Sequence, residues 1–138
     1  MNDRMLSWDA SLALGVPEID AHHQELFAQA ARFDAAVRAG HPARELRGLF
    51  DFLAGYAEDH FQAEQRLMSE IGYPRLASHQ LEHAEFRRRL STLLPHWESE
   101  GDSTALLMAV SGFLTRWLRE HIATSDRAIG DFLAARPR

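Results

Sequence analysis

Apolar residues recur at intervals of three and four along four stretches of the chain, and polar residues fill the positions between them. In the first stretch the apolar positions include Ile19, Leu26, Phe27, Ala30 and Phe33. This spacing places the apolar side chains along one face of an α-helix, where a neighbouring helix can cover them. The pattern therefore predicts four amphipathic helices that bury their apolar faces against one another.

Glycine and proline separate these stretches, because glycine commonly follows a helix end and proline cannot continue a helix. We expect Pro95 and the sequence Gly101-Asp102-Ser103 to close the third helix, with Asp102 or Ser103 capping the fourth. The predicted helices cover about residues 18–39, 43–71, 75–97 and 103–135. Such short connections favour an all-α, up-down-up-down four-helix bundle, preceded here by an N-terminal arm, residues 1–17.

Length and composition narrow the class of protein further. A chain of 138 residues fits a single domain with one core, so we expect one domain over residues 1–138. No stretch approaches the roughly 18 consecutive apolar residues that span a bilayer, and the chain does not start with a basic segment followed by an apolar run. These features predict a cytoplasmic protein without a membrane partner. The net charge of −5, with no basic block, argues against nucleic-acid binding.

The chain contains no cysteine but eight histidines. The absence of cysteine excludes disulfide bonds, thiolate-bound zinc and iron–sulfur clusters, so any metal must be held by nitrogen and oxygen. Eight histidines are a heavy loading for a side chain that is costly to bury without a partner. The positions of the histidines therefore carry the functional information.

Polar residues replace apolar ones on the inward face of all four predicted helices. The replacements are His23 in the first helix, His60 and Glu64 in the second, His79 and His83 in the third, and His121 with Asp126 in the fourth. A single histidine on an apolar face is usually a hydrogen-bonded core residue. Five imidazoles and two carboxylates together hold more lone pairs and charges than mutual hydrogen bonds can satisfy, whereas cations accept all of them. The group predicts a metal site.

The spacing of these residues supports that interpretation. His60 and Glu64 are one helical turn apart, and the two histidines of the third helix have the same spacing, so each pair points to a common centre. His121 and Asp126 are five residues apart, which separates their directions by about 140° on a regular α-helix. The two residues must therefore either contact neighbouring ions or lie on a locally distorted helix.

The number of ligands indicates two ions. Imidazole and carboxylate donors without sulfur suit iron or manganese better than copper or a structural zinc site. If Glu64 and Asp126 each bridge the ions, together with a solvent-derived oxide or hydroxide, the five histidines divide as three and two. One ion is then six-coordinate, and the other keeps an open position for one small ligand.

Several motifs follow one another in a fixed order along nearly the whole chain. They are Trp8, Gly15-Val16, Ile19-Asp20, His23, Leu26-Phe27, HFQAE at 60–64, HQLEHAEF at 79–86 and WLREHIATSD at 117–126. In these motifs the sequence resembles the bacterial hemerythrins. The resemblance implies a four-helix bundle with a non-haem di-iron centre, bridged by oxide or hydroxide, that binds dioxygen reversibly. It also implies that the protein is a binder and not an enzyme.

The resemblance further implies a role for each site residue. It assigns His79, His83 and His121 to the saturated iron, His23 and His60 to the iron with the open position, and Glu64 and Asp126 to the bridges. It assigns to the dioxygen pocket Phe61, Trp117, Leu118 and Ile122. One departure is His22, which stands where the family usually has Gln and is expected at the edge of the bundle. Small anions such as azide are expected to compete with dioxygen.

Two other functions stay open from the sequence. The first is a di-iron enzyme acting on dioxygen or nitric oxide, although oxygen-activating carboxylate bundles carry Glu-x-x-His pairs and mostly oxygen ligands. This chain is rich in histidine and has the order His-x-x-x-Glu. The second is an oxygen- or iron-sensing module that acts through a separate protein partner. Within the carrier hypothesis, storage, delivery to an oxygen-consuming enzyme and detoxification are all open.

Overall fold

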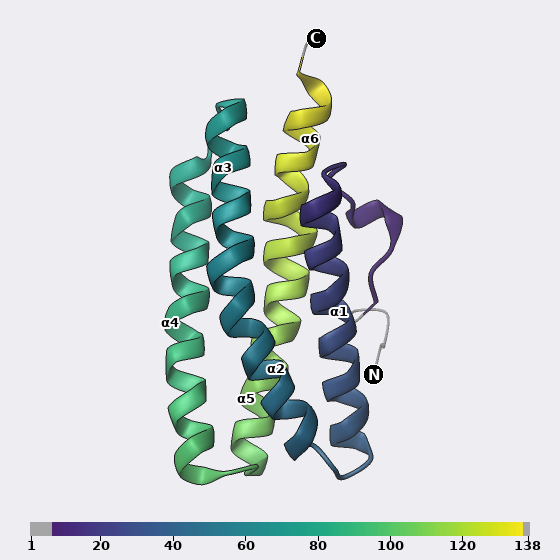
Figure 1. Cartoon of the computed structure of the whole chain (residues 1–138), viewed down its shortest axis with the longest axis vertical. Helices are drawn as coiled ribbons and strands as arrows, with labels where there is room; N and C mark the ends of the chain where they lie inside the picture. Colours follow the sequence, from purple (N-terminus) through teal and green to yellow (C-terminus); the bar gives the residue numbers. More distant parts are fainter. Residues whose placement is uncertain (1–6, 137–138) are drawn as a thin grey trace.

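Four long helices run side by side, each antiparallel to the one before it, in the computed structural model of the protein, which describes residues 7–136 (Figure 1). The segments in chain order are η2 (Ala10–Leu12), α1 (Pro17–Arg38), α2 (Ala43–Gly55), η3 (Tyr56–His60), α3 (Phe61–Ile71), α4 (Leu76–Glu100), α5 (Thr104–Arg116), η4 (Trp117–Asp126) and α6 (Arg127–Ala135). The second helix comprises α2, η3 and α3, and the fourth comprises α5, η4 and α6. The described residues contain no strand, which confirms the predicted all-α four-helix bundle.

The described part of the N-terminal arm, residues 7–16, lies alongside α1, and Leu14 packs against α6 (Figure 1). The backbone N–H groups of Leu14 and Gly15 donate to the carboxylate of Asp20 in the first turn of α1, at 2.8 and 3.2 Å. A Cβ atom on Gly130 of α6 would lie 3.0 Å from the Cα of Leu14. Glycine at 130 therefore permits the close contact between the arm and the fourth helix.

The helix ends follow ordinary capping chemistry. Pro17 occupies the first position of α1, where its missing N–H costs nothing. Gly72 ends α3 in the left-handed conformation with φ 65°, and the N–H of Tyr73 donates to the carbonyl of Met68 at 2.9 Å. The hydroxyl of Ser103 accepts from the N–H of Leu106 at 3.1 Å, which confirms Ser103 as the cap of the fourth helix.

The third helix does not end at Pro95, because α4 continues through that residue to Glu100. A proline inside a helix removes one backbone hydrogen bond, so the turns beyond it need another source of stability. Trp97 supplies that stability. Its ring stacks on Phe50 at a centroid distance of 5.2 Å, and its indole N–H donates to Asp102 at 2.8 Å.

The buried apolar side chains form two clusters, separated by a polar layer. In α1, Ile19 belongs to the smaller cluster and Leu26 to the larger one, with the buried His23 between them. In the second helix Phe61 belongs to the larger cluster and Met68 to the smaller one. Polar side chains thus occupy a layer inside the bundle, shielded from water at both ends. No helix in the described part of the chain is long and apolar enough to cross a membrane.

Candidate metal centre

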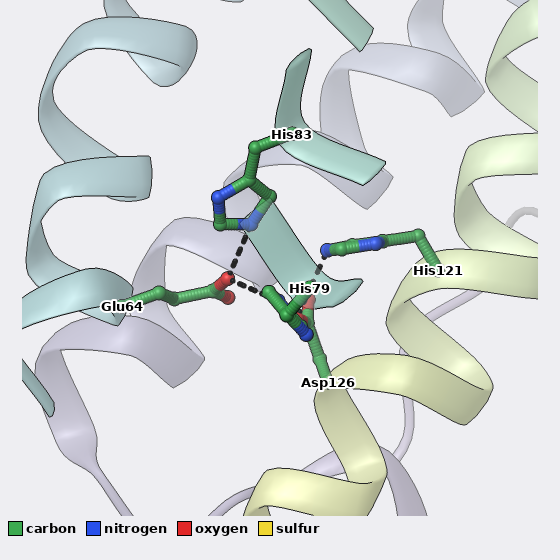
Figure 2. Close-up of side chains that lie close together, drawn as sticks. All are labelled: Glu64, His79, His83, His121 and Asp126. Carbon is green, nitrogen blue, oxygen red and sulfur yellow. Dashed lines mark hydrogen bonds and ion pairs between the residues drawn. The ribbon is translucent and has the colours of Figure 1, made fainter. Parts of the chain in front are cut away.

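All seven predicted ligands converge in the polar layer, and each is at most 3% exposed. They come from all four helices. The residues are His23 on α1, His60 on η3, Glu64 on α3, His79 and His83 on α4, and His121 and Asp126 on η4. Figure 2 shows five of them pointing toward one another from three helices. Because water does not reach these side chains, they must satisfy one another or hold cations.

A local change of helix type brings His121 and Asp126 to the same side. The segment η4 is π-helical, and a π-helix pairs each residue with the one five positions later. The Nε2 atom of His121 therefore lies 3.0 Å from Oδ1 of Asp126. Of the two arrangements that the sequence left open, the structure has the locally distorted helix.

A second π-helical segment, η3, ends at His60. The side chain of Arg87 on α4 crosses to this segment and donates to the carbonyl of Ala57 at 3.0 Å. Its guanidinium also lies over the ring of Phe61, 5.1 Å from the centroid. Although Arg87 is an exposed residue of α4, its side chain thus stabilises the segment that positions His60.

Glu64 divides the histidines into two sets. Its Oε1 atom lies 3.1 Å from Nε2 of His79 and 2.9 Å from Nε2 of His83. Its Oε2 atom lies 3.2 Å from Nε2 of His23 and 2.8 Å from Nε2 of His60. A carboxylate with one oxygen toward each set has the arrangement of a bridge between two cations.

Asp126 divides the histidines in the same way. Its Oδ1 atom lies 3.0 Å from Nε2 of both His79 and His121, and its Oδ2 atom lies 3.0 Å from Nε2 of His23. The donor atoms accordingly form two groups, each compact enough for one ion, with both carboxylates common to the two. One set contains three histidines (His79, His83 and His121) and the other contains two (His23 and His60).

The buried charges shift the pKa values of the site. Burial opposes protonation of His23 and His79, but their contacts with Asp126 and Glu64 outweigh it and raise the two pKa values to about 10 and about 9. Burial also opposes ionisation of Glu64, yet the histidines around it, led by His60, hold its pKa well below the usual range. In the absence of cations, protons on histidine therefore compensate the two carboxylates.

Three of the buried polar atoms that could bind a metal lack a hydrogen bond. Both carboxylate oxygens of Asp126 and Nε2 of His121 are inaccessible to water and make no hydrogen bond in the described structure. Their ion-pair contacts at 3.0 Å do not replace hydrogen bonds, and a cation would compensate the burial of all three atoms. The donor set fits a metal centre because it combines neutral imidazoles and carboxylates in two closed groups.

Comparison with known proteins decides the family. The model of the hemerythrin HHE cation binding domain matches residues 14–133. The chain belongs to the hemerythrin family. It is 29% identical to a bacteriohemerythrin of Clostridium acetobutylicum over 126 residues, which cover 89% of this chain and 97% of that protein. It is 28% identical to a bacteriohemerythrin of Stenotrophomonas maltophilia over 131 residues, covering 95% and 83% of the two chains.

A relative outside the bacteria has similar coverage. The chain is 30% identical over 120 residues to a hemerythrin-like protein of Naegleria gruberi, and the match covers 87% of each chain. The family match includes all seven side chains of the polar layer. The resemblance to hemerythrins is therefore confirmed, and the cluster fits the cation site of such a domain.

Three residues that the sequence did not assign to the hemerythrin site contact its histidines. Glu82 lies with Oε1 2.7 Å from Nδ1 of His121 and accepts from the hydroxyl of Ser125 at 3.0 Å. His22 lies with Nδ1 2.9 Å from Nδ1 of His60. Tyr56 stacks on the ring of His60 at a centroid distance of 4.6 Å. The signal for each was proximity in sequence: Glu82 and His22 are adjacent to predicted ligands, and Tyr56 precedes His60 by one turn.

The four residues predicted for the small-ligand pocket are all buried next to the histidines. Phe61 stacks flat on His83 and Trp117 on His121, both at 3.8 Å between centroids. Leu118 is 2% exposed and Ile122 is 0% exposed, within the larger apolar cluster. The indole N–H of Trp117 donates to the hydroxyl of Tyr56 at 3.0 Å, so Tyr56 joins the same wall. The lining of this end of the site is apolar apart from that pair.

Proposed function

We propose that the metal centre holds two iron ions and that the protein binds dioxygen at them reversibly. The observation that carries the proposal is the division of the histidines by the two carboxylates: Glu64 and Asp126 each present one oxygen to a set of three histidines and the other oxygen to a set of two. Three histidines and two bridges nearly complete an octahedron. Two histidines and the same bridges leave a position for a small ligand.

The proposal assigns the ligands as the geometry groups them. His79, His83 and His121 would hold one iron, and His23 and His60 would hold the other, at which a small ligand could bind. Glu64 and Asp126, which each have one oxygen toward either set, would be shared by the two ions. Nitrogen and oxygen donors suit iron. The family match by itself supports a cation site, and iron is our assignment.

Two ferrous ions would supply the two electrons with which dioxygen is held and later released. The chain itself contributes a dry site and fixed ligands. Phe61, Leu118 and Ile122 exclude water from the end of the site that faces the larger apolar cluster. Glu82 accepts from Nδ1 of His121 and thereby presents Nε2 of that ring to the centre. These apolar side chains have no carboxyl group that could protonate a bound ligand.

The donor set favours a binding protein over an enzyme that oxidises an organic substrate. Oxygen-activating bundles hold their metals mostly by carboxylates, whereas five of the seven side chains here are imidazoles. The cavity beside His22 and His60 has a volume of about 250 Å³, and its lining includes the carboxylates of Asp51 and Asp59. An acidic lining offers little to an apolar substrate. We therefore assign dioxygen and small anions such as azide as the ligands.

The experiment that tests this proposal combines metal analysis with ligand competition. The purified chain is loaded with ferrous iron without oxygen, and the bound iron is counted per chain. We expect two iron ions per chain. After oxidation to the diferric form, we expect the chain to bind one azide. When the centre is reduced again with azide present, dioxygen should no longer bind. One ion per chain would refute the two-ion centre. Simultaneous binding of azide and dioxygen without mutual effect would refute the single open position.

A further inference from the structure

His22 lies on α1 directly before the predicted ligand His23, yet it faces a different partner. Its Nδ1 atom is 2.9 Å from Nδ1 of His60, which belongs to the next helix. The two rings meet edge to face, with centroids 5.0 Å apart and an interplanar angle of 83°. His22 is half-buried, whereas His60 is 1% exposed. A side chain expected at the edge of the bundle thus contacts the interior.

The other nitrogen of His60 faces the metal centre. Its Nε2 atom lies 2.8 Å from Oε2 of Glu64 and 3.0 Å from Nε2 of His23. When Nε2 of an imidazole binds a cation, its remaining hydrogen is on Nδ1, which then has to donate. Among the described residues the structure gives Nδ1 of His60 one acceptor, the Nδ1 atom of His22.

Tyr56 restricts the same ring in another way. It stacks on His60 with an interplanar angle of 18°, which fixes the plane of the imidazole. Stacking leaves the ring free to turn over about its Cβ–Cγ bond, which exchanges the position of each nitrogen with that of a ring carbon. On the outer side of the ring, the directional hydrogen bond at Nδ1 favours the orientation with Nε2 toward the centre.

We infer that His22 is the positioning residue for His60 and thereby sets the affinity of the ion held by two histidines. This inference rests on the two-ion centre of the proposed function. The set with three histidines includes His121, whose outer nitrogen is held by Glu82 at 2.7 Å. The set with two histidines depends on His60 for half of its nitrogen ligands. Loss of the His22 contact weakens this ion selectively.

The cavity beside the pair distinguishes two kinds of substitution. His22 and His60 both border the cavity of about 250 Å³, together with Asp51, Phe52 and Asp59. In His22→Ala water can enter and accept the hydrogen of His60, so the loss is partial. In His22→Leu an apolar side chain excludes water and accepts nothing. In His22→Gln the amide oxygen restores an acceptor.

The test measures the affinities of both ions by titration with ferrous iron against a chelator, without oxygen. We expect His22→Leu to weaken the second ion by about 10- to 100-fold, the usual effect of removing an outer partner of a ligand. His22→Ala should lie between this variant and wild type, and His22→Gln should stay within about threefold of wild type. The affinity of the first ion should not change. The matched control is His96→Leu, a half-buried histidine of α4 outside the site.

Two results would overturn the inference: wild-type affinity for both ions in His22→Leu, or equal weakening of both ions, which indicates general loss of structure. Failure of the proposed function is distinguishable, because the wild-type chain would then bind fewer than two ions. In that case the hydrogen bond between His22 and His60 can still be tested directly. In ¹⁵N-labelled, metal-free protein we expect a coupling across the hydrogen bond between Nδ1 of His22 and Nδ1 of His60. Its absence from a folded chain would refute the positioning role.

Discussion

Nε2 of His121 lies 3.0 Å from Oδ1 of Asp126, although five residues separate the two along the chain. The π-helical conformation of η4 produces this contact, because its backbone hydrogen bonds span five residues and those of an α-helix span four. One helix therefore supplies both a histidine of one set and a carboxylate that faces both sets. Because of this contact, the fourth helix places polar atoms next to both sets of histidines.

Deletion of one exposed residue inside η4 should therefore be tolerated. Removing Thr124 leaves His121 and Asp126 four positions apart, which an ordinary α-helix places on one face, as for His60 and Glu64. We expect the variant to fold and to bind two metal ions per chain. The control deletes Met108, an exposed residue of α5, which turns every later residue by about 100°. If both deletions abolish metal binding, the extra residue of η4 is not what brings the two ligands together.

Metal uptake should release protons. Contacts with Asp126 and Glu64 raise the pKa of His23 to about 10 and that of His79 to about 9 against the opposing effect of burial, so both are protonated in the metal-free chain at pH 7.5. A cation can bind only to neutral imidazole. We expect about two protons per chain to be released during anaerobic loading at that pH, measured by pH-stat titration. Release of no protons would contradict the compensation of the two carboxylates by protonated histidines in the metal-free chain.

The same protons should stabilise the metal-free fold. A histidine whose folded pKa exceeds the ordinary value of about 6.5 contributes stability that is complete below that pH. This contribution is lost as the pH rises through the folded pKa values, which are about 9 for His79 and about 10 for His23. The melting temperature of the metal-free protein should accordingly fall between pH 7 and 10, and that of the loaded protein should fall less.

The residues of the polar layer were predictable from the sequence because each interrupts an apolar stripe at an inward position. His60 and Glu64 share a face at a spacing of four, so their convergence needed no structure. The division into sets was not predictable from spacing, because it depends on which oxygen of Glu64 faces which histidine. The same limit applies to His22, whose contact with His60 depends on how two helices cross.

The fold was predictable to a similar degree. Four periodic segments and short turns indicate an antiparallel bundle, and the turn residues indicate where the chain reverses. Pro95 shows that contacts between distant residues can override the local tendency of proline to end a helix. Its effect on the helix is opposed by the contacts of Trp97 with Phe50 and Asp102, which come from residues distant in the chain or beyond the helix end. The π-helical conformation of η3 has no comparable signal in the sequence.

The hydrogen bond between Trp117 and Tyr56 should contribute measurably to stability. In Tyr56→Phe the buried indole N–H loses its acceptor, which costs about 1–3 kcal/mol in the free energy of unfolding. The matched control is Tyr73→Phe, because the hydroxyl of the buried Tyr73 makes no hydrogen bond to the described residues. Urea unfolding of metal-free protein measures both variants. Equal effects of the two substitutions would show that the Trp117 contact adds nothing.

Leu118 should keep the ligand pocket dry. It precedes His121 by three residues and is 2% exposed. In Leu118→Asn the seven ligands remain, but a polar side chain and water enter the pocket, so the oxygen-dependent absorption should decay to that of the ferric pair at least tenfold faster. A buried polar substitution also lowers stability, by about 1–3 kcal/mol. The control is therefore Leu106→Asn, which is equally buried in α5 and far from the ligands in sequence. Unchanged decay in Leu118→Asn would show that Leu118 is only a packing residue.

The most direct test of the account is optical spectroscopy of the iron-loaded chain through repeated cycles of dioxygen and argon. A centre with three and two histidines, two bridging carboxylates and a dry open position should take up one dioxygen for every two iron ions. The visible charge-transfer band should appear under dioxygen, disappear under argon, and return with nearly full amplitude in each cycle. A band that forms once and decays, with dioxygen consumed and no recovery under argon, would contradict reversible binding and indicate an oxidase.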